Sequence, residues 1–538
     1  MSRSVLVDLL RRAYQIAQIS HTAQVPAAEV NDWLSCSASQ ISRRQVLGGI
    51  AATGLFGIHP RLGQLSGNPV APGLPSPSAI ADAKILVVGA GVAGLTVAYR
   101  LRQAGIPVDI VEANQRPGGR LRSLRGVAGS PGVVELGGEF IDSRHTAVRS
   151  LAAELGLQLA DLHEADAGLE PEILYFQGQK INHAQVIEAF SPLAQRIAHD
   201  LKTLGSREIT YHNPSPDAIQ LDRLSLAEYL AAAPIDPIIE QLVQVAYVTE
   251  FGRDAADQSC LNMLFLIGSE VGKWSTYGIS DERYHVIGGN DQIPQKLAEQ
   301  LADTIEPGTA LESIRLTPAN RYQVSLRQGA TSVERIYDQV VLTIPFTVLR
   351  QVELAVDLPP VKRQSIAQLG YGTSSKLSVP YQERIWKTRY ASTVSIYTDL
   401  EFQNTWESAR YSTEPSGWVT DLRGGMAGIT LGSDRPSTHA QKLTAHLEQI
   451  FPGINQVKRG QAIRSIWAAE PHALGSYACY LPGQWTQIGG AEAERVGNLW
   501  FAGEHCSLGS QGYMNGACET AEQTAQSLLT ALGVPVAA

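Results

Sequence analysis

Six residues near position 90 combine the residue types and the spacing that hold a phosphate group. The segment Gly89–Gly94 reads GAGVAG, which is the pattern G-x-G-x-x-G. It follows the apolar run Ile85–Val88, typical of a strand buried on both faces, and precedes a helix predicted over residues 95–103. Glu112 follows a second predicted strand, 108–111, where its carboxylate can accept hydrogen bonds from ribose hydroxyls and would repel a 2′-phosphate. The pattern predicts a dinucleotide site that disfavours NADP.

Each glycine of this turn has a separate task. Gly89 permits the tight turn, Gly91 lets the backbone approach a pyrophosphate, and Gly94 lets helix and strand pack closely. Val92 and Ala93 lie at the helix N-terminus, where free N–H groups and the helix dipole stabilise an anion. A purely structural strand–helix–strand unit is the alternative, but the order of strand, turn, helix and acidic residue favours the nucleotide site.

The residues after Glu112 separate FAD from NAD. The segment 112–120 reads EANQRPGGR and resembles the extended flavin motif E-x-x-x-R-x-G-G-R. Its two arginines neutralise pyrophosphate charge, while its glycine pair lets the backbone come near. The segment 135–140, ELGGEF, resembles the stretch that runs beneath a flavin ring. The candidate cofactor residues in these two segments are Arg116, Gly119, Arg120, Gly137, Gly138 and Glu139.

From Lys84 to about Leu532 the chain resembles the flavin-containing amine oxidase superfamily, which includes monoamine, polyamine and L-amino acid oxidases. The order and spacing of four blocks carry the resemblance: Ile85–Phe140, Asp338–Leu349, Gly372–Trp386 and Trp467–Glu519. The resemblance implies an α/β fold, a two-domain FAD-binding Rossmann-type flavoprotein with a mixed α+β substrate domain. It also implies that the FAD domain is discontinuous and that the C-terminal strand and helix complete it.

The expected organisation has four parts. These are a leader over 1–58, a Pro/Gly/Ser-rich linker over 59–83, an FAD-binding domain over 84–145, 281–350 and 490–535, and a substrate domain over 146–280 and 351–489. Further patterns predict helices over 146–156 and 512–532, mostly helical structure over 180–270, and strands over 322–326, 339–344, 371–380 and 498–502.

The resemblance places a second group of cofactor residues near the C-terminus. Glu504 corresponds to a residue that contacts the ribityl–phosphate region, and Leu311 to one whose backbone meets the adenine. The helix that begins near Gly512 would direct its N-terminus at the electron-rich edge of the flavin and stabilise the anionic reduced ring. The remaining candidates of this group are Gly503, Tyr513 and Met514.

The resemblance also implies the catalytic residues. Lys376 matches the family lysine that is linked through a water to flavin N5, although a lone lysine on a strand is usually a solvated surface residue. Tyr477 and Tyr513 match the aromatic pair that flanks the amine path, where their π faces can guide and desolvate an amine. The alternative for each tyrosine is a half-buried packing role.

Two departures from the family narrow the expectation. Monoamine oxidases tether the flavin through a cysteine just before the first tyrosine of the pair, and Ser476 stands there, so we expect noncovalent FAD. Classical L-amino acid oxidases bind the substrate carboxylate through an arginine beneath the flavin, and Phe140 occupies that substrate-facing position. Arg144, Arg122 and Arg253 are the candidates to replace that arginine.

One acidic stretch could select the substrate. Glu250, Asp254 and Asp257 share one face at helical spacing, where they would present negative charge to a cationic substrate. The alternative is a solvated acidic face with Arg253 nearby. If the face binds substrate, the substrates are basic amino acids, diamines or polyamines.

The favoured function is FAD-dependent oxidative deamination of an amine or basic L-amino acid to an imine and then a carbonyl plus ammonia. Dioxygen would reoxidise the flavin and yield hydrogen peroxide. The alternatives are a dehydrogenase that passes electrons to a quinone, a desaturase or protoporphyrinogen-type oxidase, and a flavin-binding protein without turnover. Lys376 and the tyrosine pair argue against the desaturase. A homodimer is one option for assembly.

The bulk properties set the remaining limits. The 538 residues carry a formal net charge of −9, so nothing indicates nucleic-acid binding. Five scattered cysteines without a CxxC pair predict packed thiols, with no disulfide framework and no metal site. The segment Ser42–Leu47, SRRQVL, looks like a twin-arginine signal before an apolar run, 46–58, that is too short and glycine-rich for a membrane anchor. We expect export to the periplasm or an equivalent compartment, although about 40 residues precede the arginine pair.

Overall fold

The structure is a computed structural model that describes residues 83–127, 132–266, 280–408 and 410–534. The predicted leader, its arginine pair and almost all of the predicted linker lie outside the described residues. None of the helices in the described segments is both long and apolar enough to cross a membrane. The cysteines that the structure describes, Cys260, Cys479, Cys506 and Cys518, are buried and unpaired, as predicted for them.

A five-stranded parallel sheet carries the glycine turn. Its strands, in spatial order, are β20 (Leu499–Phe501), β13 (Gln339–Leu342), β1 (Ile85–Val88), β2 (Asp109–Glu112) and β9 (Ile305–Pro307). Residues of β1, β13 and β20 are almost completely buried, because helices or a second sheet cover both faces. The predicted strands at 85–88, 108–111, 339–344 and 498–502 are therefore confirmed within one or two residues.

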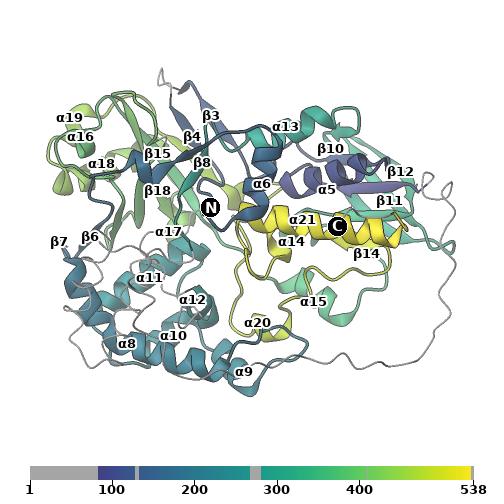
Figure 1. Ribbon diagram of the computed structural model, residues 1–538, viewed down its shortest axis with the longest axis horizontal. Coiled ribbons are helices and arrows are strands. Elements are labelled where there is room, and N and C mark those ends of the chain that lie inside the picture. Colours follow the sequence, from purple (N-terminus) through teal and green to yellow (C-terminus); the bar gives the residue numbers. More distant parts are fainter. Residues whose placement is uncertain (1–82, 128–131, 267–279, 409, 535–538) are drawn as a thin grey trace, which may run out of the picture.

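Helices from the two ends of the described chain cover one face of this sheet. Helix α5 (Val92–Gln103) lies beside α21 (Met514–Ala531), so the first and last helices of the nucleotide fold are neighbours (Figure 1). Helix α13 (Gln292–Gln300) packs on α5, and α6 (Thr146–Glu154) packs on α21. Their apolar faces share one hydrophobic core with β1. The predicted helices at 95–103, 146–156 and 512–532 are confirmed.

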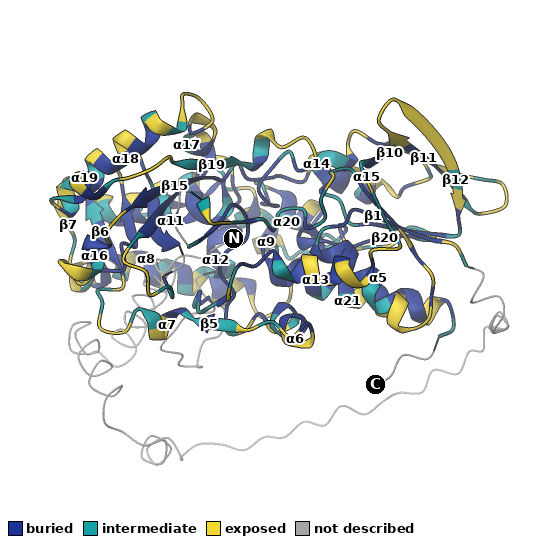
Figure 2. Cartoon of the chain, turned by 90° about the horizontal axis from the view of Figure 1, so that it is seen from above, coloured by how far each residue is buried: buried dark blue, intermediate teal, exposed yellow. Residues whose placement is uncertain are grey.

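A four-stranded sheet covers the other face. It has the order β12 (Thr331–Tyr337), β11 (Tyr322–Gln328), β10 (Thr309–Leu316) and β14 (Glu353–Ala355). Figure 2 shows β12 as an exposed edge strand, whereas the parallel sheet is buried.

A seven-stranded, mostly antiparallel sheet forms the second half of the molecule. Its order is β19 (Ile463–Ile466), β15 (Ser375–Tyr381), β18 (Gly417–Arg423), β17 (Asn404–Ser408), β16 (Ile396–Thr398), β6 (Ile173–Phe176) and β7 (Gln179–Lys180). Every residue of β15 is buried, as is every residue of β18. Strand β15 confirms a strand near 371–380 and holds Lys376 at its second position.

A group of helices below this sheet has its own core (Figure 1). These are α8 (His183–Leu204), α9 (Pro216–Asp222), α10 (Leu226–Ala231), α11 (Pro237–Phe251) and α12 (Cys260–Leu266), which agrees with the helical pattern over 180–270. Helix α11 ends at Gly252, whose φ of +70° is the left-handed conformation that favours glycine. The end of α11 thereby reaches the start of β15, because the amide of Thr373 donates to the Gly252 carbonyl at 2.8 Å.

Most of the remaining elements are short. They are β3 (Ser123–Arg125), β4 (Val133–Glu135), β5 (Leu159–Asp161), α7 (Leu162–Ala165), β8 (Tyr284–Val286), α14 (Phe346–Leu349), α15 (Pro360–Gln368), α16 (Ile385–Thr388), α17 (Gly425–Thr430), α18 (Pro436–Ile450), α19 (Ile454–Val457), η2 (Trp467–Ala469), α20 (Gln484–Gln487) and η3 (Glu504–Cys506). The strands of the parallel sheet come from the three segments predicted to form the FAD domain, and the exact domain boundaries stay a prediction.

Candidate active site

A cavity of about 660 Å³ opens at the carboxyl ends of the parallel strands. Its wall combines the glycine turn, the segment after β2, the stretch 137–138, β10, residues of the segment 467–476 and the loop after β20. This edge is where ligands bind in open α/β sheets. The described structure therefore joins the N-terminal and C-terminal candidate segments around one space.

The glycine turn has the geometry that its sequence predicts. Gly89 has a φ of +102°, and a Cβ on Gly94 would collide with the carbonyl oxygen of Gly89. Gly91, in contrast, has nothing within 4 Å of the position a Cβ would take, because it faces the cavity. Gly94 is thus needed for packing, and Gly91 leaves room for a ligand close to the backbone.

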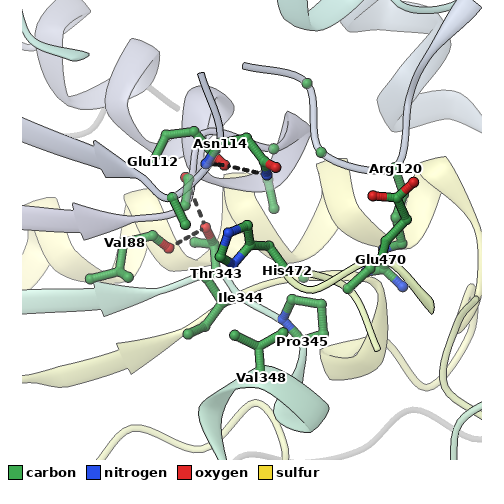
Figure 3. Close-up of a pocket in the computed structure, with 18 of the residues that line it drawn as sticks. Val88, Glu112, Asn114, Arg120, Thr343, Ile344, Pro345, Val348, Glu470 and His472 are labelled. Carbon is green, nitrogen blue, oxygen red and sulfur yellow. Dashed lines mark hydrogen bonds between the residues drawn. The ribbon is translucent and has the colours of Figure 1, made fainter. Parts of the chain in front are cut away.

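Glu112 is held at the end of β2 by backbone donors. Its two carboxylate oxygens accept from the amides of Ala90 and Asn114, each at 2.8 Å, and the Asn114 side chain donates to it as well (Figure 3). Leu311 of β10 lines the cavity near the same strand edge. These residues occupy the end of the cavity where a ribose and a base would lie.

Two arginines, Arg116 and Arg120, line the cavity. Arg116 is fixed by its own turn, donating to the carbonyls of Pro117 and Gly119 at 3.2 and 3.0 Å. Burial, and then repulsion from Arg122, lower the pKa of the Arg116 guanidinium from its ordinary value. An anionic ligand in the cavity would compensate that unfavourable burial of positive charge.

Glu504 connects four segments of the wall. Its carboxylate lies 2.8 Å from the Arg120 guanidinium and accepts from the amide of Gly512 at 2.8 Å and from that of Ala478 at 3.3 Å. Arg120 also donates to the Ser476 carbonyl at 2.9 Å. Gly512, which precedes Tyr513, is thus bonded directly to the buried carboxylate, and Ser476, which precedes Tyr477, is fixed to it through Arg120.

Most of the candidate cofactor residues line the cavity. These are Gly89, Gly91, Val92, Ala93, Glu112, Arg116, Gly119, Arg120, Gly137, Gly138, Leu311, Gly503, Glu504, Gly512, Tyr513 and Met514, together with Ser476. The candidates outside the lining are Gly94, Glu139, Lys376, Tyr477 and Phe140. Glu139 differs from expectation most clearly, because its side chain turns away from the cavity to the strand that holds Lys376.

Sequence reasoning missed a further part of the wall. Thr343, Ile344 and Pro345 follow β13, and the loop 470–473 crosses the cavity near them (Figure 3). The Thr343 hydroxyl donates to the carbonyls of Val88 and Gly89 at 2.8 and 3.1 Å, which supports the glycine turn. The position of Thr343 just after a buried parallel strand was the available signal. The loop 470–473 offers no comparable sequence signal.

Lys376 is buried and makes an ion pair. Its ammonium lies 2.7 Å from a carboxylate oxygen of Glu139, and it donates to the carbonyls of Gly137 and Glu135 at 2.8 and 3.2 Å. The residue is 6% exposed, which excludes the surface-lysine alternative. Lys376 therefore contacts the backbone of the stretch whose glycines line the cavity.

The two tyrosines meet the end of α11. The hydroxyl of Tyr513 donates to the Glu250 carboxylate, and the hydroxyl of Tyr477 donates to the Thr249 carbonyl at 3.1 Å. Burial, and then the Glu250 charge, raise the pKa of Tyr477 well above its ordinary value. Ser374 donates to the Tyr477 hydroxyl at 2.9 Å. Both rings are therefore fixed beside a carboxylate.

The acidic face predicted around Glu250 divides into three environments. Glu250 is 5% exposed at the tyrosine pair. Asp254 accepts from the backbone of Met426 at 3.1 Å, at the start of α17. Asp257 is exposed and lies 3.4 Å from Arg253. A single solvated acidic face is therefore wrong, and Glu250 alone lies beside the aromatic pair.

Phe140 has apolar surroundings. Its ring packs edge-on against Trp406 at 5.5 Å, and the guanidinium carbon of Arg410 lies 4.8 Å from its centroid. Arg410 is paired with Asp166 at 2.9 Å. The arginine in contact with Phe140 is therefore Arg410, which was not among the candidates predicted from the sequence.

Residues 92–529 match the family model described as flavin containing amine oxidoreductase. Among curated proteins, flavin-containing amine oxidase A of Bos taurus is 22% identical over 466 residues, which cover 84% of this chain and 85% of that protein. Flavin-containing amine oxidase B of Canis lupus familiaris is 24% identical over 464 residues, covering 84% of this chain and 86% of that protein.

Solved structures share the fold. Cyclohexylamine oxidase from Brevibacterium oxydans IH-35A has a TM-score of 0.73 at 21% identity and covers 84% of this chain and 100% of its own. Wild-type putrescine oxidase bound to putrescine has a TM-score of 0.71 at 18% identity, covering 83% of this chain and 99% of its own.

Proposed function

The chain belongs to the flavin containing amine oxidoreductase family and uses FAD, and from this premise we propose that it oxidises amines or L-amino acids that carry a second cationic group. The observation that carries the proposal is the contact of the buried Glu250 carboxylate with the hydroxyl of Tyr513. A fixed carboxylate beside an aromatic pair attracts a substrate with positive charge.

The residues of the cavity fit FAD. Gly91 leaves open space where the turn begins α5, and a Cβ on Gly137 would collide with the carbonyl of Arg120, so the backbone alone forms that part of the wall. Arg116 and Arg120 supply the charge that a pyrophosphate needs, and Glu112 supplies the ribose acceptor. When bound, FAD would accept a hydride equivalent, two electrons and one proton, from the carbon beside the amine nitrogen.

The tyrosine pair binds and desolvates the amine in this proposal. Tyr477 and Tyr513 are 3% and 6% exposed, so an amine between them would lose most of its water. The π faces of two rings stabilise a residual positive charge and leave the nitrogen oriented. The matched tyrosine positions and their fixed hydroxyls support this role.

Two further features stabilise negative charge that develops next to the cavity. Helix α21 begins at Met514, which lines the cavity, and an 18-residue helix has a positive N-terminal end. Lys376 brings an ammonium to the backbone of Gly137. We assign Lys376 to the flavin half-reactions on these grounds.

The proposed products follow from the balance of the reaction. The substrate loses two electrons and two protons to become an imine, and water then releases ammonia and leaves a carbonyl. Dioxygen takes up the two electrons and two protons and becomes hydrogen peroxide. Electron transfer to a quinone is the alternative. It would be indicated by flavin that stays reduced in air until a quinone is added.

The test is a hydrogen peroxide assay in air with four substrate classes: diamines, basic L-amino acids, monoamines and neutral L-amino acids. We expect turnover with the first two classes. Glu250→Gln should raise KM for diamines and basic L-amino acids about ten-fold, since one charge contact beside a desolvated site is worth about 1.4 kcal/mol. It should leave KM unchanged for monoamines and neutral L-amino acids, which lack the second cationic group.

The matched control is Asp257→Asn, which neutralises an exposed carboxylate on the same stretch of chain. Equal KM changes in the two variants would contradict a specific role for Glu250. Turnover of monoamines or neutral L-amino acids without turnover of diamines or basic L-amino acids would contradict a requirement for a second cationic group.

We also propose that FAD is held without a covalent bond. Ser476 lines the cavity at the position where monoamine oxidases carry the tethering cysteine. Acid precipitation should therefore release the yellow chromophore into the supernatant, and chromophore in the pellet would contradict this. Export by the twin-arginine route stays a proposal on the sequence alone, because the signal lies outside the described residues.

A further inference from the structure

The Lys376–Glu139 pair is completely enclosed. The side chains of the two residues are 7% and 3% exposed, and the ammonium has three acceptors: the Glu139 carboxylate and the carbonyls of Gly137 and Glu135. An ammonium has three N–H donors, so each of them has an acceptor in the protein. The hydrogen-bonding capacity of the ammonium is therefore fully used within the protein, unlike that of a lysine in a surface ion pair.

The backbone around this pair is fixed along its whole length. Besides the two carbonyls bound by Lys376, the Leu136 carbonyl accepts from Trp467 and Ser465, each at 2.8 Å. Asn290 donates to the carbonyls of Gly138 and Glu139 at 3.1 and 2.6 Å. Side chains thus hold every carbonyl from 135 to 139, and Lys376 cannot move without releasing part of the cavity wall.

Glu139 is held by neutral donors as well as by the lysine. The Trp406 indole donates to its second oxygen at 2.8 Å and Ser408 does so at 3.3 Å. The Trp406 ring centroid lies 5.2 Å from the Lys376 ammonium. These neutral contacts leave Lys376 as the cation that directly pairs with the carboxylate.

Other charged groups near the pair are already matched. The Glu135 carboxylate accepts from Ser123, His285 and Asn290. Arg410, whose guanidinium lies over the Phe140 ring, is paired with Asp166. The charge on Lys376 is accordingly balanced through Glu139.

We infer that Glu139 is a positioning residue that keeps Lys376 charged and immobile against the cavity wall, an inference that rests on the proposed role of Lys376 in the flavin half-reactions. Lys376 then acts as a stationary positive charge beside the cofactor and not as a group that swings to exchange protons. Without the carboxylate, an enclosed ammonium loses its counter-charge, and such a group either neutralises or leaves its position.

The test compares Glu139→Gln, Glu139→Asp, Lys376→Met and the double variant Glu139→Gln/Lys376→Met in anaerobic reduction and in reoxidation by dioxygen. We expect Glu139→Gln to slow at least one half-reaction about ten-fold or more while the KM for amine stays within about two-fold. Glu139→Asp should recover part of the rate. The double variant should be no slower than Lys376→Met. If Glu139 acts only through Lys376, its loss has no further effect once the lysine is absent.

The matched control is Glu407→Gln. Glu407 lies next to Trp406 and Ser408 in β17 and makes the same kind of enclosed pair, with Arg384 at 2.7 Å and the Trp386 indole at 2.9 Å, among residues outside the cavity lining. It should lower thermal stability without changing either half-reaction. If Glu139→Gln behaves as Glu407→Gln does, Glu139 is only structural and the inference fails.

The remaining outcomes separate the inference from the proposed function. If Lys376→Met is slow and Glu139→Gln reacts at the wild-type rate, the positioning role of Glu139 is overturned and the role of Lys376 stands. If Lys376→Met reacts at the wild-type rate, both the role of Lys376 and the positioning role of Glu139 are overturned. Should Glu139→Gln not fold, the rates of Glu139→Asp decide: equality with wild type would show that the carboxylate's placement does not matter and would overturn the inference.

Discussion

The guanidinium of Arg120 lies 2.8 Å from the carboxylate of Glu504, although 384 positions separate them in the chain. Arg120 belongs to the flavin-type motif that follows β2, and Glu504 follows the last strand of the parallel sheet. Their pair therefore joins the two ends of the nucleotide fold at the cavity wall. The same carboxylate holds the amide of Gly512, two residues before α21 begins.

Glu504→Gln should weaken both the fold and FAD binding. The Glu504 side chain is 5% exposed, and breaking a pair of this kind by removing one charge costs roughly 3 kcal/mol. We expect a lower unfolding temperature and at least about ten-fold weaker FAD retention on dilution, measured by the flavin absorbance that stays with the protein.

Asp303→Asn is the corresponding change at an exposed pair, where Arg102 and Asp303 are 44% and 66% exposed. It should leave the unfolding temperature close to that of wild type and leave FAD bound. A Glu504→Gln protein that keeps both its stability and its flavin would contradict the joining role.

The glycine turn allows binding and packing to be tested separately. Gly91→Ala places a methyl group in the open space of the cavity, and Gly91 has a φ of −73°, which alanine accepts readily. The apoprotein should therefore keep its unfolding temperature and bind FAD about ten-fold or more weakly. Gly94→Ala places its methyl group against the Gly89 carbonyl, so it should destabilise apoprotein and holoprotein alike.

Thermal unfolding and FAD titration of the two apoproteins measure this difference. Equal loss of stability in both variants would contradict the separation. Full FAD affinity in Gly91→Ala would place the pyrophosphate away from this turn.

The parts of the site predicted from sequence are those with local signals. The turn at Gly89, the carboxylate of Glu112 and the individual strands of the nucleotide fold follow from spacing and apolar patterns in the sequence. Thr343 had a weaker signal at the end of β13. Elements that are continuous in sequence were therefore the easier part to predict.

Relationships between distant segments were not predictable in the same way. Nothing in the sequence brings Glu139 to Lys376, because the position of β15 relative to the stretch 135–139 depends on tertiary packing. Glu250 and Asp254 share a helical spacing but separate where α11 ends at Gly252. The end of a helix changes which side chains share a surface, and a spacing rule does not contain that information.

A buried carboxylate behind the last strand gives a pH dependence of stability. Glu492 is 1% exposed, and burial raises its pKa from the ordinary value to about 7, although the nearby Lys362 opposes the shift. The Lys362 ammonium donates to the Glu492 backbone carbonyl at 2.9 Å. Tyr480 and Cys506 are the other titratable groups beside this carboxyl group.

Glu492→Gln should change that dependence in a defined direction. A carboxyl group whose pKa is raised on folding contributes stability that is complete below about pH 4.5 and is lost as the pH rises through about 7. Wild type should therefore lose stability relative to Glu492→Gln between pH 5 and pH 8, by on the order of 2 kcal/mol. Unfolding temperatures of the two proteins at pH 5 and pH 8 measure the difference.

Glu353→Gln, at an exposed glutamate, is the control and should follow wild type at both pH values. A difference between wild type and Glu492→Gln that is the same at pH 5 and pH 8 would mean that Glu492 titrates alike in the folded and unfolded chains.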